Sequence, residues 1–268
     1  MPGVAPAQPP SRFKSGFTPE QAFQAWADNG AGDPFFYHSD SDDFDWSLNV
    51  TGTYTKSAGS TGTAALTAGD GGQGLLTTAA TLNDYISLQR PIAAWTVPQG
   101  TLAGKKMFYA VRMALSDITN SAFIAGLCDT TATLFTTITD GIWFSKASGS
   151  TQLKLNIAKT STTKTFNVAS NNALVAATFL DLAFYVDKYG DVQYSVASQL
   201  FGYQQQTGMV PVPARCPTGM VYSGNKPGTV SSVYSLPTAN LALTLALQAG
   251  AAAAKTLTVD FHGVAKER

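Results

Sequence analysis

The sequence predicts an all-β protein built as an antiparallel β-sandwich, and three observations lead to this fold class. The 268 residues include 32 threonines, which favour strands, but only two glutamates, Glu20 and Glu267, which favour helices. Period-two alternation of apolar and polar residues dominates from residue 46 onward, and turn residues separate the short runs. No helical pattern separates these runs, which favours two packed antiparallel sheets over a parallel sheet with crossover helices.

Residues 1–45 differ in composition from this β domain, and we expect them to form a separate appendage. Residues 1–16 are rich in proline, which predicts an extended or disordered arm. The Thr18-Pro19-Glu20-Gln21 sequence is an N-cap signal, and the aromatic residues that follow it predict one short helix over 18–28. The predicted organisation is therefore an arm with a short helix over 1–45 and a sandwich over 46–268.

The strand signal within the sandwich region is discontinuous. Strands are predicted over residues 48–54, 106–115, 123–127, 142–144, 152–157, 165–168, 180–186, 192–196, 241–247 and 255–261. Turn residues at 140–141, 148–149 and 189–190 are expected to join antiparallel neighbours, and the glycine-rich stretch 69–74 is expected to be a flexible turn. Residues 198–239 are rich in Gly, Pro and Gln and predict a long irregular loop, a type of segment that usually contacts a partner or ligand.

Charge and cysteine content narrow the possible partners. Seventeen basic and seventeen acidic residues give a formal net charge of zero, so the chain has little electrostatic attraction for nucleic acid or an anionic membrane. Cys128 and Cys216 lie far apart and outside any C-x-x-C spacing, which predicts two free thiols. No secretory signal or membrane-spanning run is visible, and we expect a protein made in a reducing cytoplasm.

Motifs for catalysis are not found in the sequence. His38 and His262 are isolated, and His262 is expected to be structural or exposed rather than a base. The sequence has no G-x-S-x-G, H-E-x-x-H or phosphate-loop motif, and a glycosidase on this chain would need a pair of aspartates because both glutamates lie near the ends. We therefore expect a protein that is not an enzyme and needs no cofactor.

One acidic cluster has two interpretations. Asp40, Asp42, Asp43 and Asp45 lie close together, and their oxygens could gather around Ca²⁺. The spacing lacks the glycine and the closing bidentate glutamate of an EF-hand loop, which favours a solvated acidic loop or one that faces a basic patch on a partner. The sequence therefore predicts no metal site, with calcium as the lesser alternative.

The run from Asp181 to Val196, together with residues 140–144 and 106–115, resembles the concanavalin-like jelly-roll domains of lectins and of tailed-phage virion proteins. The uncharged surface composition and the amino-terminal arm are more similar to phage capsid decoration, or cement, proteins than to cellular lectins. This resemblance implies a jelly roll on the capsid surface of a virion, made in the host cytoplasm. It also implies a homo-oligomer, a dimer or trimer, that binds the major capsid protein and clamps adjacent subunits.

Aromatic residues are the expected contacts for such a partner, because hot spots of interfaces are rich in them. The candidates are Arg12, Phe13, Lys14, Phe17, Trp46, Tyr203, Tyr222 and Tyr234. Each aromatic residue could instead belong to an ordinary core, as we consider for Trp95 and Trp143, and the arm could be an untethered terminus. Two further functions remain open, a carbohydrate-binding module of a tail fibre or tailspike and a polysaccharide-degrading enzyme on the same fold.

Overall fold

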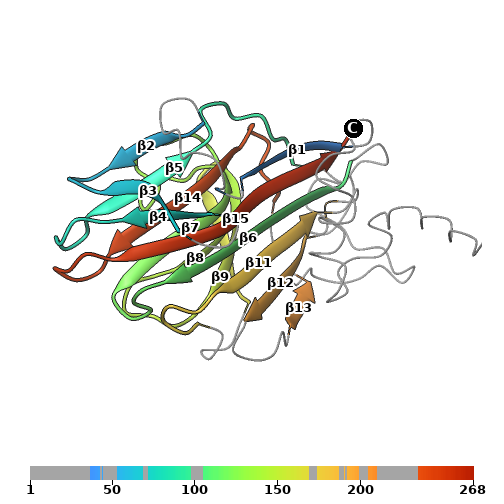
Figure 1. Ribbon diagram of the computed structural model, residues 1–268. Helices are drawn as coiled ribbons and strands as arrows, with labels where there is room; N and C mark the ends of the chain where they lie inside the picture. Colours follow the sequence, from blue (N-terminus) through green and yellow to red (C-terminus); the bar gives the residue numbers. More distant parts are fainter. Residues whose placement is uncertain are drawn as a thin grey trace, which may run out of the picture.

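The computed structural model shows a sandwich of two antiparallel sheets that lie face to face (Figure 1). It describes residues 37–42, 44, 53–68, 72–97, 105–168, 174–186, 190, 192–198, 205–209 and 235–268. These residues contain strands and no helix, which confirms the predicted all-β class. The helix expected over 18–28 lies outside the described residues.

Sheet 1 has the strand order β13-β12-β11-β6-β15-β4-β3, with β1 paired to β15. Its strands are β1 (Tyr37–Asp42), β3 (Thr63–Thr67), β4 (Gln73–Thr77), β6 (Met107–Leu115), β11 (Leu180–Val186), β12 (Val192–Ser198), β13 (Gln205–Met209) and β15 (Thr256–Glu267). One side of β15 pairs with β6, and its other side pairs first with β4 and then with β1. The long last strand thus joins early and central parts of the chain.

Sheet 2 has the order β10-β9-β8-β7-β14-β5-β2. Its strands are β2 (Thr55–Ala58), β5 (Tyr85–Gln89), β7 (Ser121–Cys128), β8 (Gly141–Lys146), β9 (Lys154–Lys159), β10 (Thr162–Asn167) and β14 (Ala242–Ala249). Strands β9 and β10 form a hairpin with a two-residue turn, Thr160-Ser161, in which both residues have positive φ (49° and 64°). Two positive φ angles define the type I′ turn, whose twist matches that of the flanking strands.

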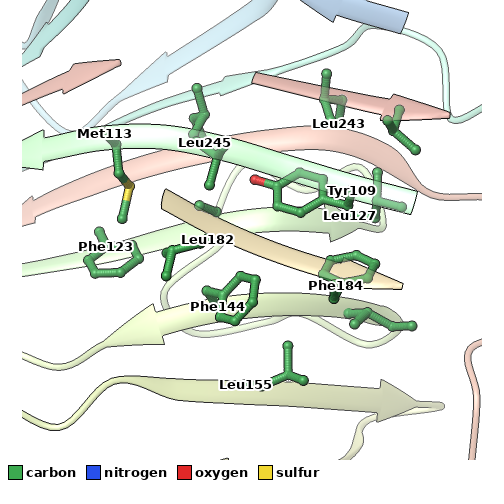
Figure 2. Close-up of a cluster of buried hydrophobic side chains, with 14 of the residues drawn as sticks. Tyr109, Met113, Phe123, Leu127, Phe144, Leu155, Leu182, Phe184, Leu243 and Leu245 are labelled. Atoms are coloured by element: carbon green, nitrogen blue, oxygen red, sulfur yellow. The ribbon is translucent and has the colours of Figure 1, made fainter. Parts of the chain in front are cut away.

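Alternate residues of the two sheets fill the space between them with large apolar side chains (Figure 2). The rings of Tyr109 on β6 and Phe184 on β11 stack with centroids 4.8 Å apart, and Phe144 from sheet 2 lies 6.1 Å from Phe184. Burial of such side chains is the main favourable term in folding. All residues of β7 are buried, because side chains also cover its outer face.

The strongest strand signals in the sequence are found as strands. Strand β11 has the predicted bounds 180–186, and the segments predicted at 106–115, 123–127, 142–144, 192–196, 241–247 and 255–261 correspond to β6, β7, β8, β12, β14 and β15. Strand β9 begins two residues later than predicted, and β10 begins three residues earlier. The turn expected at 148–149 lies between the antiparallel strands β8 and β9, and Gly190 lies between β11 and β12; Gly149 and Gly190 have positive φ. The turn expected at 140–141 is wrong, because Gly141 is the first residue of β8 and pairs with Cys128.

Short strands account for the differences. Strands β1 to β5 and β13 were not predicted: β1, β2 and β13 have few apolar residues, β3 and β4 show no clear alternation, and the alternation of Ile86 and Leu88 in β5 extends over only five residues. Thr53 and Tyr54 do not belong to a strand, and the rest of the strand predicted over 48–54 lies outside the described residues. The segment 198–239, predicted to be irregular, includes the end of β12 and the whole of β13.

The boundary expected at residue 45 does not separate β1 from the sandwich. Residues Tyr37 to Asp42 pair in register with Glu267 to His262 and so extend sheet 1. Their Tyr-His-Ser-Asp-Ser-Asp sequence has no strand-like hydrophobic pattern, and backbone pairing with β15 provides the strand conformation instead. Residues 1–36 lie outside the described residues.

Gly126 on β7 allows a close approach that no other residue type could make. A Cβ atom at this position would meet the Ile142 carbonyl oxygen and would lie 2.5 Å from Trp143 Cα. We expect Gly126→Ala to lower the free energy of unfolding by about 3 kcal/mol, because β7 and β8 would have to move apart. Urea unfolding measures this change.

Gly149→Ala is the matched control. A Cβ there would meet no atom within 4 Å, although φ is +73°. Only the strain of the left-handed conformation should appear, about 1 to 2 kcal/mol. Equal stability of Gly126→Ala and the wild type would contradict the steric account.

Candidate functional site

Most of the residues selected from the sequence lie outside the described part of the chain. This is the case for the eight capsid-contact candidates, from Arg12 to Tyr234, and for Asp43 and Asp45. Within the described ranges, no group of His, Cys, Asp and Glu side chains is arranged to hold a metal ion. No helix in these ranges is long and apolar enough to cross a membrane.

Asp40 is an internal ion-pair partner rather than part of a solvated acidic loop. Its two carboxylate oxygens accept hydrogen bonds from Arg90 Nε and Nη2 at 2.9 and 2.6 Å. The Arg90 guanidinium also donates to the Thr53 carbonyl and lies 4.4 Å from the centre of the Tyr54 ring. Asp42 accepts the Phe44 backbone N–H at 2.9 Å. The Asp40–Arg90 ion pair therefore helps to attach β1 to the sandwich, whereas the hydrogen bond of Asp42 is local.

His262 belongs to the core. It is fully buried, its ring meets Tyr109 edge to face at 5.6 Å, and neither ring nitrogen has a hydrogen-bond partner among the described residues. Burial, together with the nearby Arg90 charge, holds the pKa of His262 well below its usual range. A neutral imidazole in this position is a structural residue, as expected. Trp95 and Trp143 are also core residues, each 7% exposed.

Except for Asp181, the side-chain carboxylates in the described ranges accept a hydrogen bond from the same chain. The donors are Arg90 to Asp40, Phe44 N to Asp42, Ala79 N to Asp84, Lys255 to Asp117, Thr139 to Asp129, Thr160 N to Asp140, Gln73 to Asp260 and Lys106 N to Glu267. Asp181 lies 3.9 Å from Arg112 Nε, and its buried Oδ1 has no hydrogen-bond partner among the described residues. A glycosidase needs two carboxyl groups that face a sugar across a cleft. Asp181 and Asp260 both lie near Arg112, whose Nε is 3.9 and 3.2 Å from their carboxylates, so a guanidinium stands beside these two groups.

A groove lies on the outer face of sheet 2, beside the β7–β8 loop. Its volume is about 370 Å³, and strands β7, β8, β9, β10 and β14 contribute to it. Its lining residues are Ala122, Phe123, Ile124, Leu134, Phe135, Thr136, Ile138, Trp143, Ser145, Lys146, Ala147, Ser148, Asn156, Thr163 and Gln248. A concave site of this size fits a small ligand or a short segment of a polymer.

Apolar side chains form the floor and one wall of the groove. Trp143 lies over Gly126 and packs in a cluster with Ile124, Leu134 and further buried residues of sheet 2. Phe135 and Ile138 of the β7–β8 loop pack against this cluster. Cys128, a free thiol in the same cluster, is fully buried, and burial raises its pKa well above the usual range.

The polar groups of the groove are mostly neutral. Asn156 donates to Ser145 Oγ at 2.7 Å and accepts from Thr165 Oγ1 at 2.8 Å, so its amide is fixed. Lys146 Nζ is turned to the Ser121 and Ala147 carbonyls, and burial lowers the pKa of Lys146 to about 8. Hydroxyls and amides without a carboxylate are suited to an uncharged polar ligand.

The β7–β8 loop is anchored at both ends, which preforms the groove. Gln89 donates to the Asp129 carbonyl and accepts the Thr131 N–H, both at 3.0 Å. At the other end, the Asp140 carboxylate accepts the backbone N–H groups of Thr160 and Thr238. Apart from Trp143, the residues of this groove were not candidates from the sequence. The apolar residues Leu134, Phe135 and Ile138 within a threonine-rich loop were a signal that could have indicated it.

Solved structures that resemble this chain share its sandwich. The protein of unknown function SO2946 from Shewanella oneidensis MR-1 has a TM-score of 0.54 at 12% identity and covers 87% of each chain. Arcelin-5, a lectin-like defense protein from Phaseolus vulgaris, has a TM-score of 0.52 at 6% identity over 87% of this chain and 98% of its own. Peanut lectin has a TM-score of 0.51 at 11% identity over 86% and 97%.

No family model matches the sequence, and no curated protein does so. At identities this low, the structural likeness shows the fold alone. The fold of the chain is therefore a jelly-roll β-sandwich similar to that of lectins. Its function has to be argued from its own surfaces.

The Asp181 side chain gives a testable pH dependence. Burial raises its pKa to about 6, against the opposing effect of Arg112. Because the folded pKa lies above the unfolded value of 3.8, the folded state binds this proton more tightly, and stability falls as pH rises from about 4 to 6. We expect Asp181→Asn to stabilise the protein by about 1 to 2 kcal/mol at pH 8 and little at pH 4.

Chemical denaturation at the two pH values measures this difference. Asp260→Asn serves as the control. It removes the carboxylate that is nearer to Arg112 and leaves Asp181 as the remaining ion-pair partner of Arg112. A stabilisation by Asp181→Asn that is as large at pH 4 as at pH 8 would contradict the assignment.

Proposed function

We propose that this protein is a non-enzymatic virion protein that decorates and stabilises a phage capsid by binding the major capsid protein. The observation that supports this most is the low content of charged residues, together with the internal hydrogen bonds and ion pairs of most described carboxylates, which leave few acidic groups among the hydroxyls, amides, apolar groups and lysines of the surface. Such a surface can form many neutral hydrogen bonds over a broad area without the cost of desolvating charges.

The attachment of β1 fits this role. In the proposal, Arg12, Phe13, Lys14 and Phe17 anchor the amino-terminal arm on a neighbouring capsid subunit. Strand β1 follows the arm and is held by its ladder to β15 and by the Asp40–Arg90 ion pair. A force on a bound arm would therefore be transmitted through β1 to the sandwich.

Further contacts would come from the aromatic candidates Trp46, Tyr203, Tyr222 and Tyr234. A homo-oligomer, a dimer or trimer, would bind several capsid subunits at once, and its affinity would gain from the linked sites. The protein would be made in the host cytoplasm and would end on the capsid surface.

Binding to assembled heads of the virus that encodes the chain tests the proposal. We expect the purified protein to sediment with heads at a copy number in the hundreds. Deletion of residues 1–17 should weaken binding about tenfold, which corresponds to about 1.4 kcal/mol. Deletion of residues 1–7, which removes no aromatic or basic side chain, is the control. Heads that bind no protein would refute the proposal.

A second candidate function is carbohydrate binding by a tail fibre or tailspike module, and the groove on sheet 2 favours it. Aromatic and aliphatic walls beside neutral hydroxyls and amides match the two faces of a sugar, which are apolar on one side and rich in hydroxyls on the rim. Peanut lectin, a lectin by its name, shares the fold.

Removal of the groove wall tests this candidate. We expect Phe135→Ala to weaken binding of any glycan retained by the wild type about tenfold, as measured on a glycan array and by calorimetry. Leu82→Ala removes an equally apolar side chain that is 56% exposed and outside the groove, and it should bind normally. Glycan binding that survives Phe135→Ala would place the sugar elsewhere, and release of reducing sugar would indicate an enzyme.

A further inference from the structure

Strand β10 is an exposed edge of sheet 2. It pairs with β9 on one side, and no described strand pairs with its other side. Five of its six residues are exposed, and only Phe166 is partly buried. A free edge of this kind presents unpaired backbone N–H and C=O groups, which can add a strand from another chain.

The hairpin turn determines which backbone groups point outward. Thr160 and Ser161 form the turn, so Lys159 and Thr162 close it with a hydrogen bond. Hydrogen bonds to β9 then recur at every second residue, Lys164 and Phe166. The N–H and C=O groups of the residues between them, Thr163, Thr165 and Asn167, therefore face away from the sheet.

Unpaired lysines surround this edge. Lys164 lies on β10, Lys159 pairs in register with Thr162, and Lys154 pairs in register with Asn167. None of the three forms an ion pair with a described residue. The three lysines thus bring positive charge to this edge, with the Asp140 carboxylate beside Thr160 at the hairpin turn.

We propose that β10 is the docking edge for an extended, acidic segment of the capsid protein, which adds to sheet 2 as a further strand. This inference rests on the proposed capsid function and identifies the contact surface and the chemistry of the partner. Backbone groups of Thr163, Thr165 and Asn167 supply the ladder. An acidic residue directly opposite Lys164 lies on the same face of the sheet and within reach of its ammonium group.

The same lysines disfavour a second copy of this chain as the occupant. Two β10 strands side by side would bring two sets of lysines together. Lysine on an edge strand is a known barrier to self-association. The positively charged β10 edge therefore repels the β10 edge of a second copy and favours pairing with an acidic strand.

Two variants test the backbone and the charge separately. Thr165→Pro removes an outward N–H and leaves the hydrogen bonds to β9, since proline is tolerated on the solvent side of an edge strand. Lys164→Glu reverses the charge. We expect each variant to bind assembled heads about tenfold more weakly in sedimentation. A third variant, Lys164→Gln, should bind with a weaker dependence on salt than the wild type between about 50 and about 500 mM.

Matched controls isolate the edge. Thr165→Val retains the N–H, and Lys56→Glu makes the same charge change on β2, the opposite edge of the same sheet. Both should bind within about twofold of the wild type, and thermal unfolding will show whether each variant is folded. If Thr165→Pro does not fold, Lys164→Glu and Lys56→Glu still decide the test.

The outcomes separate the two proposals. If the wild type binds heads and Thr165→Pro and Lys164→Glu bind equally well, the docking edge is wrong and the capsid function stands. If the wild type does not bind heads, the capsid function fails, and the docking edge fails with it. A wild-type dimer in solution that Thr165→Pro dissociates would show that β10 binds a second copy and would overturn the choice of partner.

Discussion

The apolar layer between the two sheets is the interaction on which the rest of the structure depends. Tyr109, Phe144 and Phe184 meet at its centre, and they come from β6, β8 and β11 (Figure 2). Because the side chains of a strand alternate between two faces, filling this layer determines which residues face outward. The outward positions of sheet 2, among them Trp143 and Asn156, then form the groove.

A second constraint comes from the small number of charges. The described part of the chain uses its acidic side chains to hold strands and loops together. Lys255 donates to Asp117 at 2.6 Å, which keeps the pKa of Asp117 well below its usual range, and Arg90 holds β1 through Asp40. Because Asp40 and Asp117 form ion pairs within the chain, the described surface offers mainly hydroxyls, amides and a few lysines outside ion pairs to other molecules.

The groove and the β10 edge are neighbouring but different surfaces. Thr163 contributes its side chain to the groove, while its backbone faces the edge. The groove is lined with neutral groups and suits a compact uncharged ligand. The edge offers a backbone ladder between lysines and suits an extended acidic chain. Variants of the groove and variants of the β10 edge can therefore be tested separately in the same protein.

The sequence by itself determined the all-β class and the long apolar strands, such as β6 and β11, because alternation along a strand is a local signal. Trp95 and Trp143 could be weighed as core residues, and His262 as a structural one. Only the tertiary structure decided that β1 joins β15, that Asp40 pairs with Arg90, and that the β7–β8 loop covers sheet 2. These contacts join residues far apart in the chain, and they depend on strand order and register, which no local pattern encodes.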